Sequence, residues 1–496
     1  MNTVIKLIAT AMTIVLSMPS VRAAESQKYK DAEKAIRKYG GRVDKEYPRD
    51  YFGRPGKFRM IYFVNSDLTD SHLLELKGDI ETIFNEDTSD EIKRVLDLQF
   101  TKVTGQYLSS LKAAKLTGLD LSSTLVRDTG LTQLIELDSV KFVYFDYNYL
   151  SFTSLKKFID SDNDRRDSDR LWGFSLAGAT VVDDGTNEGP PKPVGRMRLI
   201  KTVQGLKELR ELDLSDNEIK DADIWDDAFV VFGKLIWLYL SNNRLTDSSV
   251  GAIAKLKTLT SLDLSRNKIK GDLQGGAITD EGVSRLRGLV NLRYLYLSGT
   301  GVTNEGLAKL KGLEQLEWLE ISDTQTHIGE VLLSKQPLAA AAACVPNGPG
   351  RVQSHLLARA VQLAVSKVYQ KSLEPVSFRK LTLLYANNTF VSDADLLVIA
   401  RLPALTTLNV SGTTVTADGL ERFMCLLSSL TFPPPPPSVS EIFPFNLYEK
   451  KVFRLKFDNV DAKPVTLKRL EAIAQPRLSL SVPGPSDPAG KPLSRP

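Results

Sequence analysis

The chain has 496 residues, longer than one compact core usually runs, so it should form several domains or one elongated repeat structure. Its 64 lysines and arginines against 60 aspartates and glutamates give a net charge of +4. So small a surplus does not supply the clustered basic faces of nucleic-acid-binding proteins, and no nucleic-acid partner is expected.

The first residues have the three-part pattern of a secretory signal. Lys6 precedes an apolar run over residues 7–18, and small residues follow at Ala23 and Ala24. The pattern predicts a signal peptide over residues 1–24, because the run is well short of the roughly 20 residues that span a bilayer. We therefore expect a mature chain that is periplasmic or extracellular and has no transmembrane segment.

Internal repetition dominates the chain after an expected N-terminal helical cap over residues 25–57. The clearest copies read LDLSDNEIKDAD, LYLSNNRLTDSS, LDLSRNKIKGDL, LYLSGTGVTNEG and LEISDTQTHIGE, and they begin at Leu212, Leu238, Leu262, Leu295 and Leu319. Most copies follow one another by about 24 residues, a spacing in the range of leucine-rich repeats. The array is predicted to cover residues 58–325, with irregular loops near 160–200 and 271–277.

This pattern predicts an α/β fold, a leucine-rich-repeat solenoid or horseshoe. Alternating leucines should form short strands of a parallel concave sheet, because side-chain direction alternates along a strand. Thr or Ser with Asp, as at Thr246 and Asp247, should begin convex helices by satisfying free N–H groups. Weaker copies bring the total to about thirteen strands; they begin at Ile61, Leu96, Leu119, Val143, Phe174, Leu384, Leu408 and Leu455.

The pattern is interrupted after the clearest copies. Residues 326–381 are predicted to be an irregular helical insertion, either an enlarged repeat or a separate element, and repeats resume over 382–430. TFPPPPPSVSEIFPF over 431–445 predicts a stiff Pro-rich linker, favoured over a ligand for a proline-recognising groove. A degenerate terminal repeat or cap is expected over 446–476, and a disordered tail over 477–496.

The regular copies resemble the leucine-rich-repeat proteins of planctomycetes and related bacteria. The similarity is close at LYLSGTGVTNEGLAKL and LNVSGTTVTADGLERF, and AEKAIRKYGGRV is similar to the short helix and entry segment that often precede the first repeat. The resemblance covers roughly residues 30–325 and 380–425. It implies a fold and an interaction role, because that family has no common reaction.

Catalytic and metal-binding motifs are not found in the sequence. There is no G-x-S-x-G, H-E-x-x-H or phosphate-binding loop, and His72, His327 and His355 are scattered. His72 and His327 are expected to be exposed on the helical side of a repeat. Cys344 and Cys425 could form one bridge or remain buried thiols. No cofactor is therefore predicted.

One loop has the beginning of a calcium-binding motif. Asp160, Asp162 and Asp164 have the spacing of an EF-hand-like loop, but Arg165 stands where glycine should turn the chain and Leu171 where the bidentate Glu should be. These residues are a weak calcium candidate, and a solvated charged loop is the favoured interpretation.

The concave face is the best candidate for binding. Residues beside the strand leucines should point into it, and there Tyr and Trp recur beside carboxylates, with Phe142, Tyr144 and Asp146 in an earlier repeat. Strands favour aromatic residues in general, but Tyr and Trp also anchor protein interfaces and stack on sugar rings. The predicted binding residues are Trp237, Tyr239, Asp263, Tyr294, Tyr296, Trp318 and Glu320.

The sequence therefore predicts an exported, non-enzymatic scaffold that binds a protein or peptide on its concave face. A glycan-binding envelope protein would use the same aromatic side chains, and the sequence does not separate the two. An enzyme with a site in the irregular 325–381 segment, or a purely structural envelope protein, are the alternatives from other classes.

Overall fold

The computed structural model describes residues 27–49, 55–86, 91–183, 192–267, 278–326, 378–400, 402–430, 453–456 and 478–481. The chain divides into two compact units, Met1–Val194 and Gly195–Pro496. Several predicted features lie outside the described residues: the signal peptide, the Pro-rich linker, nearly all of 326–381, His327, His355, Cys344 and the side chain of Cys425. None of the described helices is long and apolar enough to cross a membrane.

The first unit begins with helix α2 (Gln27–Lys38) and an antiparallel pair of strands, β1 (Arg42–Arg49) and β2 (Pro55–Tyr62). From β2 onward the sheet is parallel, through β3 (Ile92–Asp97), β4 (Gly118–Asp120), β5 (Phe142–Tyr144) and β7 (Gly173–Ser175). A smaller sheet contains β6 (Tyr149–Ser151), β8 (Thr180–Asp183) and β9 (Lys192–Pro193). The helical segments are α3 (Asp70–Glu75), α4 (Lys77–Asn85), η1 (Leu108–Ala114), α5 (Asp128–Ile135), α6 (Phe152–Asp162) and η2 (Asp167–Asp169).

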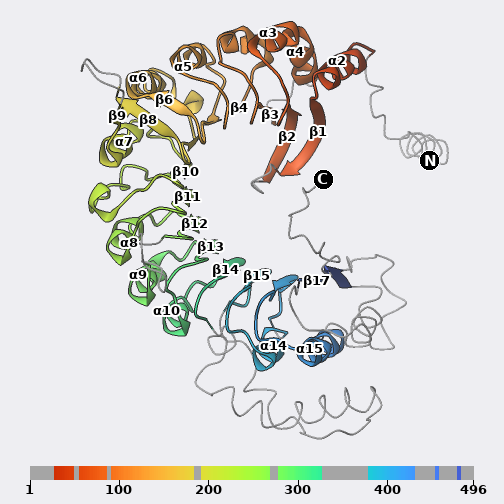
Figure 1. Ribbon diagram of the computed structural model, residues 1–496, viewed down its shortest axis with the longest axis vertical. Helices are drawn as coiled ribbons and strands as arrows, with labels where there is room; N and C mark the ends of the chain where they lie inside the picture. The colour runs from red at the N-terminus through yellow and green to blue at the C-terminus, as the bar shows by residue number, and fades with distance from the viewer. Residues whose placement is uncertain are drawn as a thin grey trace, which may run out of the picture. The chain divides into compact units, whose positions relative to one another are not determined.

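The second unit forms a parallel sheet in sequence order. Its strands are β10 (Glu211–Asp213), β11 (Trp237–Tyr239), β12 (Ser261–Asp263), β13 (Tyr294–Tyr296), β14 (Trp318–Glu320), β15 (Leu383–Tyr385), β16 (Thr407–Asn409), β17 (Phe453–Lys456) and β18 (Leu478–Ser481). Its helical segments are α7 (Arg196–Val203), η3 (Asp221–Asp223), α8 (Asp247–Ile253), α9 (Asp280–Arg285), η4 (Leu286–Gly288), α10 (Asn304–Lys309), α14 (Asp393–Ile399) and α15 (Ala417–Leu430). Helices α8, α9 and α10 lie outside the strands (Figure 1).

Each predicted repeat copy contains a strand, which confirms the solenoid prediction. Three predictions at the ends and in the loops differ from the structure. The predicted helical cap over 25–57 also contains β1 and the start of β2, and the irregular region near 160–200 contains β8 and β9 in addition to the predicted strand β7. Part of the predicted disordered tail, Leu478–Ser481, is a strand. It pairs with β17 through backbone hydrogen bonds and extends the sheet beyond the clear repeats.

The strands are short, and their central leucines form the core. Leu212, Leu238, Leu262, Leu295 and Leu319 are in register with one another and fully buried. In a three-residue strand the two residues that flank a buried centre must face the opposite side of the sheet. The core therefore fixes which residues line the inner face.

Buried asparagines satisfy the backbone where the chain leaves the strands. Asn243 accepts hydrogen bonds from the backbone N–H groups of Asn217, at 3.0 Å, and Ile219, at 2.9 Å. It donates to the carbonyls of Leu214 and Leu240, at 2.9 and 3.1 Å. One side chain thus satisfies buried backbone groups of two successive repeats.

The Thr-Asp-x-Gly pattern joins neighbouring repeats on the helical side. Thr303 caps α10 by accepting a hydrogen bond from Glu305 N–H at 3.2 Å. The backbone N–H and hydroxyl of Thr303 both donate to Asp280, in the preceding repeat, at 2.8 and 2.6 Å. A Cβ at Gly306 would lie 3.0 Å from Asp280 Cα and overlap its carboxylate. Glycine is therefore required at position 306, because Asp280 of the preceding repeat packs directly against it.

We predict that Gly306→Ala lowers the free energy of unfolding by about 1–3 kcal/mol, because the added methyl group displaces Asp280. The measurement is chemical denaturation of the wild type and the variant. Gly312→Ala is the matched control, since nothing lies within 4 Å of a Cβ there, and it should leave stability nearly unchanged. Equal effects of the two substitutions would contradict this packing explanation, as would an undiminished loss from Gly306→Ala in an Asp280→Ala background.

Candidate functional site

Two columns of side chains line the inner face of the second unit. The first column takes one residue from each strand from β10 to β16, and the parallel register aligns Glu211, Trp237, Ser261, Tyr294, Trp318, Leu383 and Thr407. The second column lies two residues further along each strand and contains Asp213, Tyr239, Asp263, Tyr296, Glu320, Tyr385 and Asn409. All seven predicted binding residues lie in these columns, and all are half-buried.

The aromatic residues form one close cluster and a separate group. The rings of Tyr296 and Trp318 have centroids 5.7 Å apart, and Trp318 stacks on Tyr385 at 5.4 Å with 14° between the planes. Trp237 lies two strands from Tyr294, with Ser261 between them. The predicted binding residues Trp237, Tyr294, Tyr296 and Trp318 are therefore not one continuous aromatic surface, because β12 separates Trp237 from the other three.

Tyr385 is the residue that sequence reasoning missed. It follows Leu384 in the copy LYANNTFVSDAD, so it occupies the position that Tyr239 and Tyr296 occupy in their repeats. The long interruption between β14 and β15 hid its proximity to Trp318. Alignment of the strand positions across the interruption would have placed it in the cluster.

Trp318 has a polar group that the fold does not satisfy. Its indole N–H is buried and has no hydrogen-bond acceptor in the structure. A buried donor without an acceptor lowers stability, typically by about 1–3 kcal/mol. The position of Trp318 between the Tyr296 and Tyr385 rings therefore leaves its donor without an acceptor.

Serines that follow the strands hold the carboxylates of the second column, in the same repeat for Asp213 and Asp263 and in the preceding repeat for Glu320. Asp213 accepts from Ser215 N–H and Asp263 from Ser265 N–H, both at 2.8 Å, and Glu320 accepts from the Ser298 hydroxyl at 2.9 Å. These hydrogen bonds fix the orientation of the carboxylates at the end of each strand. The repeat pattern L-x-[LI]-S supplies the donors of these hydrogen bonds, because a serine follows the second apolar residue in each of these repeats.

Burial makes two of these carboxylates weak acids. It raises the pKa of Asp213 to about 7, against the hydrogen bonds from Ser215, and the negative charges of Asp263 and Glu211 add to the rise. Burial raises the pKa of Asp263 to about 6, with a further contribution from Glu320. The pKa of Tyr296 is also raised by burial and by the neighbouring carboxylates. The column therefore holds acidic groups whose ionisation is opposed by burial and by one another's charge.

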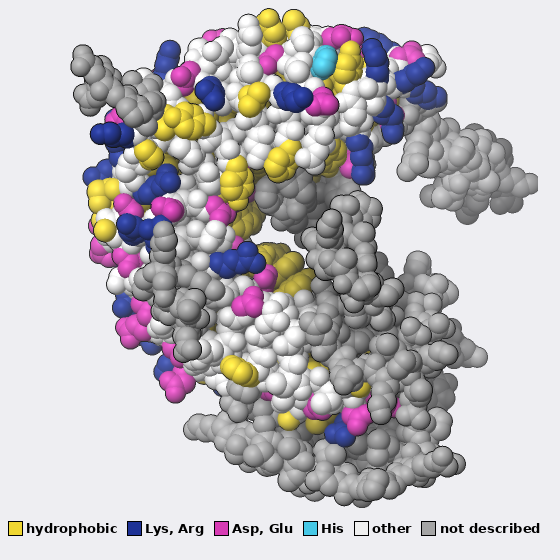
Figure 2. All heavy atoms as spheres, viewed as in Figure 1, with side chains coloured by type: hydrophobic (Ala, Val, Ile, Leu, Met, Phe, Trp, Pro, Cys, Tyr) yellow, Lys and Arg dark blue, Asp and Glu magenta, His cyan; other side chains and the backbone are white. Residues whose placement is uncertain are grey.

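The opposite edge of the sheet is electrostatically balanced. Arg293, one residue before β13, forms a bidentate ion pair with Glu317, one residue before β14, with N–O distances of 2.7 and 2.9 Å. Its guanidinium also lies 5.8 Å from the Tyr294 ring centroid. Figure 2 shows hydrophobic, acidic and basic side chains close together near β13 and β14. The aromatic cluster thus has an ion pair beside it where the strands begin. Where the strands end, it has acidic side chains beside it.

In the first unit, the residues at the corresponding strand positions are buried, contrary to prediction. Phe142 and Tyr144, expected on the concave surface, are almost fully buried in a cluster with Phe58, Met60 and Val95. A Cβ at Gly118, on the neighbouring strand, would overlap the Phe142 ring. Glycine lets the ring lie flat across β4, so these aromatic groups are part of a core and not of an accessible surface.

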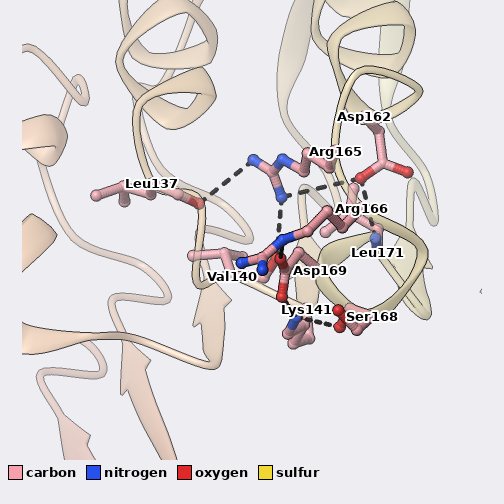
Figure 3. A network of polar contacts seen from close by, with 9 residues as sticks. All are labelled: Leu137, Val140, Lys141, Asp162, Arg165, Arg166, Ser168, Asp169 and Leu171. Carbon is pink, nitrogen blue, oxygen red and sulfur yellow. Dashed lines mark hydrogen bonds and ion pairs between the residues drawn. The ribbon is translucent and has the colours of Figure 1, made fainter.

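The weak calcium candidate is a structural turn (Figure 3). Asp160 is exposed and pairs with Lys156, whereas Asp162 is buried and accepts from Leu171 N–H at 3.0 Å. Residues two apart on a helix do not face each other, so α6 directs these carboxylates apart. The interpretation as a solvated loop is wrong for Asp162, because the segment is fixed from within.

Arg165 fixes this turn to the preceding repeat. Its guanidinium donates to the carbonyls of Val140 and Leu137 at 3.1 and 3.3 Å, and it lies 3.8 Å from Asp162. Figure 3 shows the side chain between the two repeats. The charged run around residue 165 therefore has a structural role.

His72 likewise has a local role. Its Nδ1 accepts a hydrogen bond from Thr69 N–H at 3.3 Å, at the start of α3, and its ring lies 4.9 Å from that of Tyr39. The side chain is half-buried, so the prediction of an exposed histidine is wrong. Among the described residues, no group of three His, Cys, Asp or Glu side chains is placed to hold a metal ion.

Comparison with known proteins identifies the repeats. Family models for the leucine-rich repeat match residues 207–269 and 289–311. Toll-like receptor 3 of Bos taurus is 26% identical over 251 residues, which cover 47% of this chain and 26% of the receptor. Toll-like receptor 3 of Boselaphus tragocamelus is 26% identical over 269 residues, which cover 51% and 28%. The chain thus spans about a quarter of the length of these curated relatives.

Two solved bacterial structures are also similar. An internalin from Listeria monocytogenes is 17% identical with a TM-score of 0.37, covering 73% of this chain and 84% of the internalin. A leucine-rich-repeat protein from Leptospira interrogans is 17% identical with a TM-score of 0.32, covering 71% and 78%. The fold assignment depends on the repeat matches and the observed sheet: the chain is an α/β leucine-rich-repeat solenoid.

We predict that Asp213→Asn raises the unfolding midpoint by roughly 2–4 °C at pH 8 and leaves it unchanged at pH 4. The folded-state pKa of about 7 lies above the ordinary 3.8, so this group's stabilising contribution is present below pH 3.8 and is lost as pH rises through 7. Thermal melts at the two pH values measure the difference. Glu314→Gln, at an exposed position of the same unit, is the control; a pH-independent effect of Asp213→Asn would contradict the explanation.

Proposed function

We propose that this leucine-rich-repeat chain is an exported, non-enzymatic scaffold that binds a protein or peptide partner on the inner sheet face of its second unit. One observation carries the proposal. Half-buried Tyr and Trp side chains stand beside carboxylates in the two inner columns, where neither the leucine core nor the helix caps require them. Large apolar surface with polar groups at its edge is the composition of protein interfaces.

The chemistry of the cluster formed by Tyr296, Trp318 and Tyr385 supports this proposal. Tyr and Trp give large contact areas with few rotatable bonds, so they lose little conformational entropy on binding. The indole ring of Trp318 is held between the Tyr296 and Tyr385 rings, although its N–H has no acceptor there. Stacking at 5.4 Å holds the Trp318 and Tyr385 rings in place before a partner arrives.

The repeat architecture supports a rigid mode of binding. Each strand from β11 to β17 is paired on both sides, and polar contacts such as those of Asn243 and Asp280 join successive repeats. A preorganised surface incurs a small ordering cost when a partner binds. Repeat proteins commonly use an extended inner surface in this way, and the similarity to receptor repeats supports the same role for this chain.

The proposed location outside the cytoplasm depends on the sequence alone. Residues 1–24 have the pattern of a signal peptide, with Lys6 before the apolar run and Ala23 and Ala24 at its end. A periplasmic or extracellular protein that has leucine-rich repeats and no catalytic motif fits a recognition role. The relation to planctomycete-type repeat proteins remains a prediction from the repeat signature.

We predict that replacing Trp237, Tyr296 and Trp318 together by Ala abolishes partner binding, because this removes three of the six aromatic side chains in the two columns, including both tryptophans. The measurement is a pull-down from envelope and secreted fractions, followed by quantitative mass spectrometry. The partners that disappear with this variant identify the ligand class, protein or glycoprotein.

The matched control replaces three exposed hydrophobic side chains of the same unit outside the two columns, Val230, Val290 and Phe390, by Ala. This control should retain every partner, and circular dichroism should show that both variants fold. Equal recovery of every partner by the wild type and the inner-face variant would refute binding at this face.

A further inference from the structure

The second column of the inner face alternates between acid and aromatic residues. From β10 to β15 it reads Asp213, Tyr239, Asp263, Tyr296, Glu320 and Tyr385, one residue from each strand in parallel register. Neighbouring strands lie about 4.8 Å apart, so the carboxylates recur about every 9.6 Å and a tyrosine ring stands between each pair.

These three carboxylates have no ion-pair partner among the described residues. Their hydrogen bonds come from neutral serine groups, Ser215 for Asp213, Ser265 for Asp263 and Ser298 for Glu320. Two acidic residues outside the columns do have counter-ions: Glu208 pairs with Lys234 at 2.5 Å, and Glu317 pairs with Arg293. The ladder is therefore an acidic row without a built-in counter-ion, which charge complementarity matches to a basic partner.

We infer that the binding segment of the partner is an extended, polyproline-II-like chain that carries Lys or Arg at every third residue, with the cations at Asp213, Asp263 and Glu320. This inference depends on the proposed function, since it specifies the partner of the same face. It goes further by fixing the charge, the spacing and the backbone conformation of the ligand.

The spacing selects this conformation. A polyproline-II helix has three residues per turn and rises about 3.1 Å per residue, so every third side chain lies on one face at about 9.3 Å. A β-strand repeats a face at about 6.7 Å. An α-helix repeats at about 10.5 Å over seven residues. The first and third carboxylates are about 19 Å apart. Two turns of a polyproline-II helix match this distance to within about 1 Å, whereas two seven-residue repeats of an α-helix exceed it by about 2 Å.

The tyrosines explain why the cation should be carried on a long side chain. Asp213 and Asp263 are half-buried, so a charged group must reach past Tyr239 to meet Asp213 and between Tyr239 and Tyr296 to meet Asp263. Lys and Arg can place their aliphatic stems along apolar rings while the charged head meets the carboxylate. The ring faces also attract the cation. A short cationic group on a bulky backbone would not reach these acids.

The test uses synthetic peptides of identical composition, each with three lysines among alanine and proline. One peptide has lysine at every third position, a second at every second position, and a third has the lysines in one block. A fourth peptide departs from this composition: it has lysine at every seventh position and alanine in place of proline, so that it is helical and tests the helical alternative. Fluorescence anisotropy with the full chain measures their affinities, and circular dichroism confirms the conformation of each free peptide.

We expect the peptide with lysine at every third position to bind about 10-fold more tightly than the others, and Asp263→Asn to remove this preference. Asp418→Asn, at an exposed carboxylate on α15, should retain it. Equal affinities of all four peptides, or preference for the helical one, would overturn the inference.

The same variants separate this inference from the proposed function. If the inner-face aromatic variant loses its partners while Asp263→Asn has no effect on any peptide, the face binds a partner but the basic, spaced ligand is wrong. If the aromatic variant binds both its partners and the spaced peptide as the wild type does, the proposed function itself fails.

Discussion

The burial of one leucine in each three-residue strand is the constraint on which the rest of the second unit depends. Leu212, Leu238, Leu262, Leu295 and Leu319 are in register and fully buried, so their flanking residues must face the other side of the sheet. A one-residue slip of any strand would exchange the two sets of side chains and is therefore strongly disfavoured. The buried leucines thus determine which side chains line the inner face, although they do not lie on that face themselves.

The two units show that the same repeat geometry can build either a core or an accessible surface. In the first unit glycine at position 118 lets Phe142 lie flat across the neighbouring strand, and large apolar side chains cover the sheet. In the second unit the strand at the corresponding place carries Ser261, and carboxylates alternate with tyrosines. The side chains that flank the buried residues, and not the fold, decide whether the face is open to a partner.

Most of the fold follows from the sequence because the repeat is local. The period near 24 residues and the buried leucines locate every repeat strand, and the Thr-Asp-x-Gly signature has a direct cause in the contact between Asp280 and Gly306. The antiparallel strand β1, the small sheet and β18 lack the repeat pattern. Their pairing depends on tertiary contacts that no local signal in the sequence specifies.

The site was predicted less completely than the fold, for physical reasons that differ by residue. Phe142 and Tyr144 were expected on the surface because their strand positions match, but burial there depends on the glycine of a neighbouring strand. Asp162 has the spacing of a calcium ligand, yet the helix turns it inward toward Leu171 and Arg165. Tyr385 was missed because it lies 65 positions after Glu320 in the sequence. In the sheet, however, their strands β14 and β15 are direct neighbours.

Hydroxyl-radical footprinting of the chain with a partner recovered by pull-down tests the central claim most directly. If the inner face of the second unit is the binding surface, oxidation of Trp237, Tyr294 and Tyr296 should fall when the partner binds, while the exposed Tyr147 and Tyr149 of the first unit should react as before. Unchanged oxidation of the inner-face residues in a saturated complex, with protection elsewhere, would contradict it.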